Sequence, residues 1–158
     1  MPGAQPGVSA GGLMETGSTS RLRAAVVVGH PHPQYGGTMH TKVVYQSAKA
    51  LARIGCAVLR FNFRGTGASA GSFDGGDGER DDFRAALDFM HDEHGDIPLW
   101  VAGMSFGAWV ALAVGVEDPR VSVLLGLSTP VAGTTSSLWL VATSRSSSST
   151  GSETRSVR

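Results

Sequence analysis

Two apolar runs meet at the pentapeptide Gly103–Gly107, which reads Gly-Met-Ser-Phe-Gly. The run before it, led by Pro98, has the pattern of a buried strand, and the run after it has the pattern of a helix. Glycines two positions either side of a serine let backbones pass where a Cβ would collide. The context predicts a sharp strand-to-helix turn that projects the Ser105 hydroxyl. A glycine-rich turn with an exposed serine is the alternative, but the flanking patterns favour a nucleophile.

The helix that follows Ser105 places N–H groups and a partial positive charge beside that hydroxyl. The N–H of Phe106 is therefore a candidate donor to an oxyanion. A second donor is expected from the loop at 30–37, which follows the first long apolar run. Pro31 and Pro33 have no N–H, so the candidate donor in this loop is the N–H of His32.

His30 and Met104 adjoin these positions and are predicted to contact the substrate. Two other interpretations of the histidine loop stay open: a rigid turn without a binding role, or a metal site formed by His30, His32 and His40. No carboxylate or cysteine lies nearby in the sequence to complete a tetrahedral metal set. We therefore predict neither a metal nor an organic cofactor.

Apolar runs alternate with helical patterns through most of the chain. Strands are predicted at 24–29, 56–63, 98–102 and 121–127, helices at 38–54, around 83–90 and at 106–115, and an edge strand around 12–15. The alternation predicts an α/β fold, a three-layer sandwich with an open, mostly parallel sheet. Ligands bind at the carboxyl ends of such strands, where His30, Arg64 and Ser105 fall.

The residue types of two further segments, the loop at 64–67 and the helix around 83–90, suggest roles for them. The stretch Gly65-Thr66-Gly67 is compatible with dinucleotide binding, but that fingerprint must open a helix and more loop residues follow here. Arg64 is interpreted as anchoring this loop. On the helix around 83–90, the acidic residues are predicted to face solvent; they are Asp81, Asp82 and Asp88.

The 158 residues carry a formal net charge of zero, which gives no sign of a nucleic-acid or membrane partner. Cys56 is the single cysteine and lies in an apolar run, so a disulfide framework is excluded and a cytoplasmic location is predicted. The expected partner is a small-molecule acyl substrate.

Three motifs in order resemble those of α/β-hydrolases. They are His30-Pro31-His32-Pro33 with Gly36-Gly37, then Phe61-Asn62-Phe63-Arg64-Gly65, then Gly103–Gly107. They are most similar to a small bacterial branch related to dienelactone hydrolases and prolyl-oligopeptidase catalytic domains, and the likeness covers about residues 20–131. The resemblance implies a Ser-acid-His triad in that chain order. It also implies hydrolysis of an ester, thioester or amide through an acyl-enzyme.

The sequence departs from that triad after Ser105. All five histidines precede the serine, and the later carboxylates are Glu117, Asp118 and Glu153. A serine without a neighbouring base stays protonated and weakly nucleophilic. We therefore expect impaired catalysis. One alternative is that His30 or His32 approaches from the neighbouring loop as a substitute base. The other is a catalytically inactive binding protein of this fold, or a fragment without function.

The predicted organisation is a flexible leader at 1–20, a partial α/β-hydrolase domain at 21–133 that is incomplete on its C-terminal side, and a Ser/Thr-rich disordered tail at 134–158. A frameshift near Gly133 is one hypothesis for the tail. With suitable codons, the bases for Ser149 to Arg155 read one position earlier can encode His-Gly-Glu-Arg-Asp-Glu, an acid-bearing loop. Sequencing the coding DNA tests this, and a stop codon in every other frame would contradict it.

Overall fold

The computed structural model describes residues 12–18, 21–127, 138–143 and 154–157. Its strands and helices follow the alternation predicted from the sequence. The strands are β1 (Gly12–Thr16), β2 (Ala24–Gly29), β3 (Cys56–Phe61), β4 (Leu99–Met104), β5 (Val121–Leu127), β6 (Leu138–Thr143) and β7 (Thr154–Val157). The helices are α1 (Lys42–Arg53), α2 (Asp77–Glu93) and α3 (Phe106–Glu117), with a 3-10 turn at Pro33–Tyr35.

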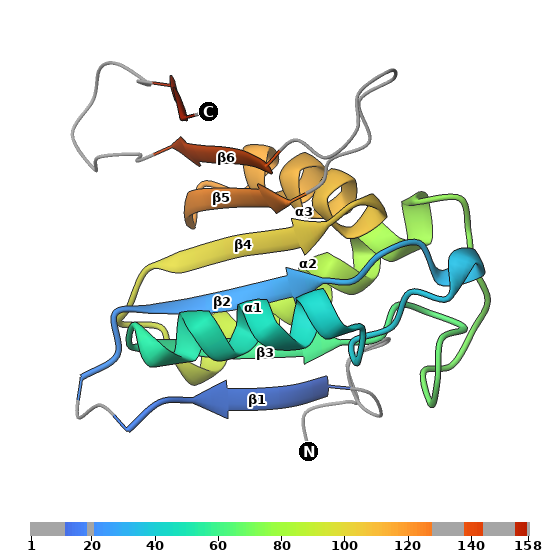
Figure 1. Cartoon of the computed structure of the whole chain (residues 1–158), viewed down its shortest axis with the longest axis horizontal. Coiled ribbons are helices and arrows are strands. Elements are labelled where there is room, and N and C mark those ends of the chain that lie inside the picture. Colours follow the sequence, from blue (N-terminus) through green and yellow to red (C-terminus); the bar gives the residue numbers. More distant parts are fainter. Residues whose placement is uncertain (1–11, 19–20, 128–137, 144–153, 158) are drawn as a thin grey trace.

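The strands form one sheet in the order β1-β3-β2-β4-β5-β6-β7 (Figure 1). Strands β3, β2, β4 and β5 are parallel, whereas β1 and β6 pair antiparallel at the two sides of this group and β7 pairs antiparallel with β6. From β2 the chain passes through α1 to β3, on one side, and from β4 it passes through α3 to β5, on the other. The carboxyl ends of β2 and β4 therefore flank a topological switch point, where open α/β sheets bind ligands.

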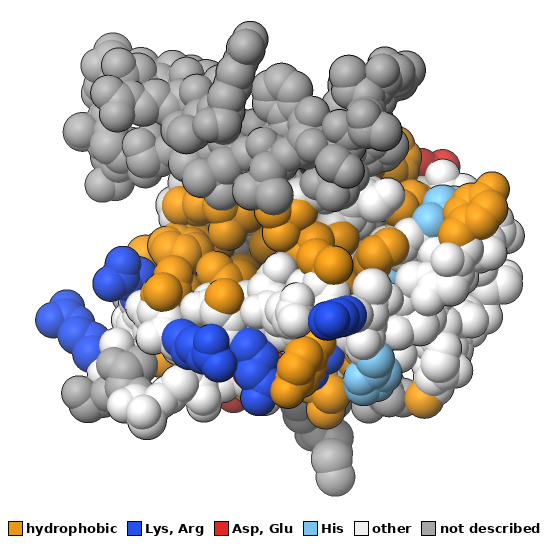
Figure 2. Space-filling model, in the orientation of Figure 1, with side chains coloured by type: hydrophobic (Ala, Val, Ile, Leu, Met, Phe, Trp, Pro, Cys, Tyr) orange, Lys and Arg blue, Asp and Glu red, His pale blue; other side chains and the backbone are white. Residues whose placement is uncertain are grey.

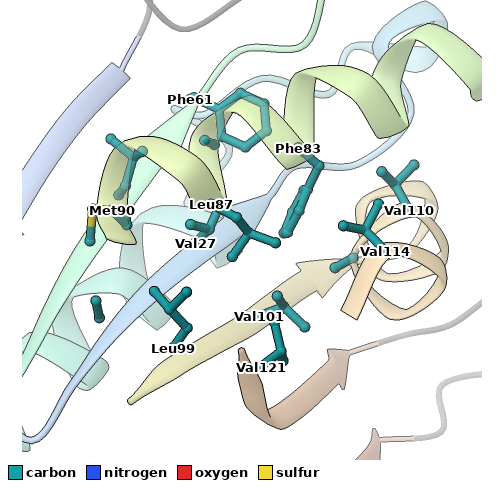
Figure 3. Packing of buried hydrophobic residues seen from close by; sticks show 14 of the residues in the cluster. Val27, Phe61, Phe83, Leu87, Met90, Leu99, Val101, Val110, Val114 and Val121 are labelled. Atoms are coloured by element: carbon teal, nitrogen blue, oxygen red, sulfur yellow. The ribbon is translucent and has the colours of Figure 1, made fainter. Parts of the chain in front are cut away.

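Helices cover both faces of the sheet and give the predicted three layers. On one face, α2 and α3 bury the larger core, with Phe83, Leu87 and Val110 packed against Val27 and Val101 of the sheet (Figure 3). On the other face, α1 packs Val44, Ala48 and Ala52 against β2 and β3. The near-continuous apolar sequences of β2 and β3 follow from this, because every residue of both strands is buried.

Several boundaries differ from the sequence prediction, and the polar contacts of the loops explain two of them. The strand predicted to reach Phe63 ends at Phe61, because the Phe63 N–H donates to the His30 ring and leaves the sheet ladder. The helix predicted from Thr38 starts at Lys42, because the Thr38 N–H donates to the hydroxyl of Thr41 in a preceding turn. Helix α2 is longer than predicted at both ends.

Part of the predicted leader and tail forms strands. Strand β1 confirms the edge strand expected around 12–15. Strands β6 and β7 lie within the segment 134–158 that was predicted to be disordered, so the prediction fails for these two stretches. The rest of that segment, the proposed frameshift point at Gly133 and residues 1–11 lie outside the described residues.

The sheet face that carries α1 is unevenly covered. Helix α1 lies over β1, β2 and β3, and no other described helix packs on this face. Trp100 of β4 and Leu125 and Leu127 of β5 are only partly buried there, and Figure 2 shows hydrophobic side chains gathered on this part of the surface. Among the described helices, none is both long enough and apolar enough to cross a membrane.

Candidate active site

Ser105 lies between β4 and α3 in a strained backbone conformation. Its φ of 51° and ψ of −116° make it the one non-glycine residue with positive φ in the described part of the chain. Such a conformation costs of order 1–3 kcal/mol and persists only where neighbouring contacts impose it. Here the Ser105 N–H donates to the carbonyl of Leu127 at 2.9 Å, and the Trp109 N–H donates to the Ser105 carbonyl at 3.1 Å. The side chain is partly exposed.

Three glycines allow the backbone approach that creates this turn. A Cβ on Gly107 would lie 2.4 Å from the carbonyl oxygens of Gly29 and His30, and one on Gly103 would lie 2.3 Å from the Gly107 carbonyl. A Cβ on Gly29 would meet the Gly107 carbonyl oxygen at 3.0 Å. The first turn of α3 therefore rests directly on the ends of β2 and β4, as expected from glycines at these positions.

The two predicted oxyanion donors lie on the segments joined by this contact. Phe106 is the first residue of α3, where backbone N–H groups have no partner within the helix. The ring of His32 lies 4.9 Å from the ring of Phe106. Among the described residues, neither N–H donates to a backbone carbonyl of a turn or loop. The structure thus brings His32, Phe106 and Ser105 together, whereas the donor roles remain predictions.

His30 is fully buried, and both of its ring nitrogens are engaged. Nε2 accepts the Phe63 N–H at 3.0 Å, which places the proton on Nδ1, and Nδ1 donates to the Pro31 carbonyl at 2.6 Å. Burial lowers the pKa of the His30 imidazole to about 4, against the effect of the Pro31 contact. The ring is therefore neutral at pH 7 and can neither contact substrate nor take a proton from Ser105. Its role is to join the loop after β2 to the end of β3.

Met104 was predicted to contact the substrate, but the structure places it in the core. It is 3% exposed and pairs with Leu127 across β4 and β5. Its side chain belongs to the core cluster under α1, on the sheet. The Met104 side chain, at the second position of the pentapeptide, therefore packs in the core and is not available to a substrate.

Comparison with known proteins identifies the family. The sequence model described as serine aminopeptidase, S33, matches residues 20–150. The chain belongs to this serine aminopeptidase S33 family. Its fold is that of the α/β hydrolases, as the sequence motifs predicted.

Three relatives show how much of the family's length is present in this S33-family chain. A Xanthomonas campestris α/β serine hydrolase without a lid is 37% identical, with a TM-score of 0.75 over 81% of this chain and 60% of that one. An α/β serine hydrolase homologue from Coxiella burnetii is also 37% identical, with a TM-score of 0.71 over 77% and 58%. An uncharacterised Rickettsia prowazekii protein is 43% identical over 115 residues, 72% of this chain. The chain spans about half the length of that last relative, 48%.

The S33-family chain holds the loop after β3 with two buried carboxylates, to which the sequence analysis assigned no such role. Asp82, predicted to face solvent, is 2% exposed and accepts the backbone N–H and two guanidinium N–H groups of Arg64 at 2.9–3.1 Å. The predicted anchoring role of Arg64 agrees with this contact. Glu79 is fully buried and accepts the N–H groups of Asp74 and Gly76 at 2.7 and 2.8 Å.

The described residues contain no grouping of three His, Cys, Asp or Glu side chains that could hold a metal ion. Both ring nitrogens of His30 take part in hydrogen bonds, so neither is available to bind a metal ion. The sequence analysis also missed an aromatic cluster around His32, to which Tyr35 and Phe73 contribute. Its only sequence signal is one aromatic residue in each of two glycine-rich loops.

Replacing Gly107 by alanine should destabilise the fold by at least about 2 kcal/mol, because the added Cβ meets backbone atoms that cannot move aside. Gly36→Ala is the matched control: its φ is +81°, but nothing lies within 4 Å of the added Cβ. The control should lose only about 1 kcal/mol, from conformational strain. Urea unfolding of both variants measures the difference, and equal losses would contradict the close-contact account.

The buried His30 should make folding sensitive to acid. Its pKa is about 4 in the folded chain and 6.5 in the unfolded chain, so the unfolded chain binds the extra proton between these values. This contribution to stability is complete above pH 6.5 and is lost as the pH falls towards 4, at most roughly 3 kcal/mol.

In His30→Gln, the free energy of unfolding should fall less steeply between pH 7 and 4.5 than in the parent chain. His40→Gln, which removes an exposed histidine, should retain the parent slope. Urea unfolding across this pH range measures both. An unchanged slope in His30→Gln would show that another group carries the effect.

Proposed function

We propose that this chain is a serine hydrolase that cleaves an ester, thioester or amide bond through an acyl-enzyme. The observation that carries the proposal is the strained Ser105 at the start of α3, held at the switch point of a sheet shared with serine hydrolases. A backbone cost of this size at one polar residue is typical of a functional site. The expected substrate is a small acyl compound.

In this mechanism the Ser105 Oγ attacks the substrate carbonyl carbon. The bond from Oγ to carbon forms as the carbonyl electron pair moves onto oxygen, and the N–H groups of His32 and Phe106 stabilise that oxyanion. Collapse of the intermediate expels the alcohol, thiol or amine, which leaves with a proton. Water then attacks the acyl-serine, releasing the acid and restoring the Ser105 hydroxyl.

The attack requires a base to take the Ser105 proton, and we propose that its lack impairs this sequence. Every histidine precedes Ser105, against the order of the family's triad. Both ring nitrogens of His30 are engaged, and Nδ1 of His32 accepts the Gln34 N–H. Glu117 is the last residue of α3 and Asp118 follows it, about 18 Å from the start of the helix at 1.5 Å per residue. The Asp118 carboxylate moreover accepts a hydrogen bond from the guanidinium of Arg120, which lowers the pKa of that carboxyl.

The same observation favours a second candidate, a binding protein that retains the shape of the site without its chemistry. A neutral serine hydroxyl and two backbone donors would still bind an acyl compound or its acid. A cytoplasmic location, consistent with the single buried Cys56, belongs to both proposals.

A serine-reactive fluorophosphonate should label the folded protein at Ser105, slowly, and Ser105→Ala should abolish labelling. Added imidazole should accelerate labelling by replacing the missing base, since a positioned general base contributes of order a hundredfold or more. Ser47→Ala, a change on α1, is the control and should label like the parent. Intact-protein mass spectrometry follows the reaction. Folded protein that stays unlabelled with and without imidazole would overturn the hydrolase proposal in favour of the binding protein.

A further inference from the structure

Three aromatic rings surround the imidazole of His32. The rings of Tyr35 and Phe73 each lie 4.8 Å from it, and that of Phe106 lies 4.9 Å from it. Interplanar angles of 61°, 41° and 53° show edge-on or tilted contacts. These are the separations and tilts that aromatic pairs favour, because positive ring edges meet negative ring faces.

The cluster is joined to Ser105 through the chain. Phe106 follows the serine in the chain, while His32 and Tyr35 belong to the loop after β2 and Phe73 to the loop after β3. All three segments leave the carboxyl ends of neighbouring strands. A group attached to a carbonyl carbon at Ser105 would therefore lie at the strand ends from which these aromatic residues come.

Tyr35 is 85% exposed, so its ring adds little to the buried core. Its position is nonetheless fixed by the backbone of a tight turn. The Tyr35 and Gly37 N–H groups both donate to the His32 carbonyl at 3.1 Å, and the Gln34 N–H donates to Nδ1 of His32. An exposed tyrosine on a hydrogen-bonded turn that also carries a candidate oxyanion donor is suited to contact with a ligand, because its ring offers apolar area and a polar tip.

We propose that His32, Tyr35 and Phe73 form an aromatic platform that binds an aryl group in the acyl part of the substrate. The preferred substrates are then esters or related derivatives of arylacetic and similar aryl-bearing carboxylic acids. The substrate class rests on the proposed function, whereas binding to the platform itself needs no reaction at Ser105.

Ring geometry distinguishes an aryl group from an alkyl group of similar size. Both bury apolar area, but only an aryl ring adds edge-to-face contacts with the rings of the platform. Such contacts correspond to an affinity advantage of about twofold to tenfold beyond area. An ester of phenylacetic acid should therefore bind better than the matching ester of cyclohexylacetic acid.

The test measures binding of methyl phenylacetate and methyl cyclohexylacetate to Ser105→Ala, which cannot turn them over, by ligand-observed NMR titration. The phenyl ester should bind about twofold to tenfold more tightly. Adding Tyr35→Ala should bring the two affinities together, while Tyr35→Phe should retain the preference. Tyr45→Ala, which removes a 44% exposed tyrosine from α1, should also retain it.

The outcomes separate this inference from the proposed function. Equal affinities in the starting variant, or a preference unchanged by Tyr35→Ala, would overturn the platform. A preference lost in Tyr35→Ala, together with absent fluorophosphonate labelling of the parent, would support the platform and refute the serine chemistry. Labelling at Ser105 without a phenyl preference would support the serine chemistry and overturn the platform.

Discussion

The contact between the first turn of α3 and the ends of β2 and β4 determines the rest of the site. Backbone meets backbone there, with no side chain between Gly107 and the carbonyls of Gly29 and His30. The approach forces the connection from β4 to α3 to turn within one residue, and Ser105 takes positive φ as a result. It also brings the loop after β2 against the start of the helix. The strain at the serine and the nearness of both predicted oxyanion donors thus have a single cause.

The sequence predicted those features that depend on local pattern. Continuous apolar runs identified β2, β3, β4 and β5, and the glycine spacing located the turn at Ser105. It could not predict features created by distant polar contacts. Phe63 continues an apolar strand pattern, yet its N–H donates to His30. Asp82 occupies a polar position on helix α2, yet it accepts a hydrogen bond from Arg64 in the loop after β3. In each case the two hydrogen-bonded residues belong to different segments of the chain, so the periodicity of one segment carries no information about the contact.

The histidine loop illustrates how one residue type can take opposite roles two positions apart. His30 points inward, where burial and two hydrogen bonds keep it neutral and fixed. His32 is only partly buried and lies among the aromatic rings of Tyr35 and Phe73. Sequence reasoning predicted that His30 contacts the substrate and that the backbone N–H of His32 donates to the oxyanion. The fully buried ring joins its loop to the end of β3, whereas the partly exposed ring lies in the aromatic cluster.

The strand order has a consequence for how the site forms during folding. Ser105 follows β4 and the histidine loop follows β2, and these strands pair directly although α1, β3 and α2 separate them in the chain. Neither half of the site can be completed by a local segment, because the close glycine contact exists only after this non-local pairing. Closing such long loops is slow, and contacts of this kind dominate the folding rates of parallel sheets. The reactive geometry at Ser105 therefore reports on cooperative assembly of the central sheet, and partial unfolding that separates β2 from β4 removes it altogether.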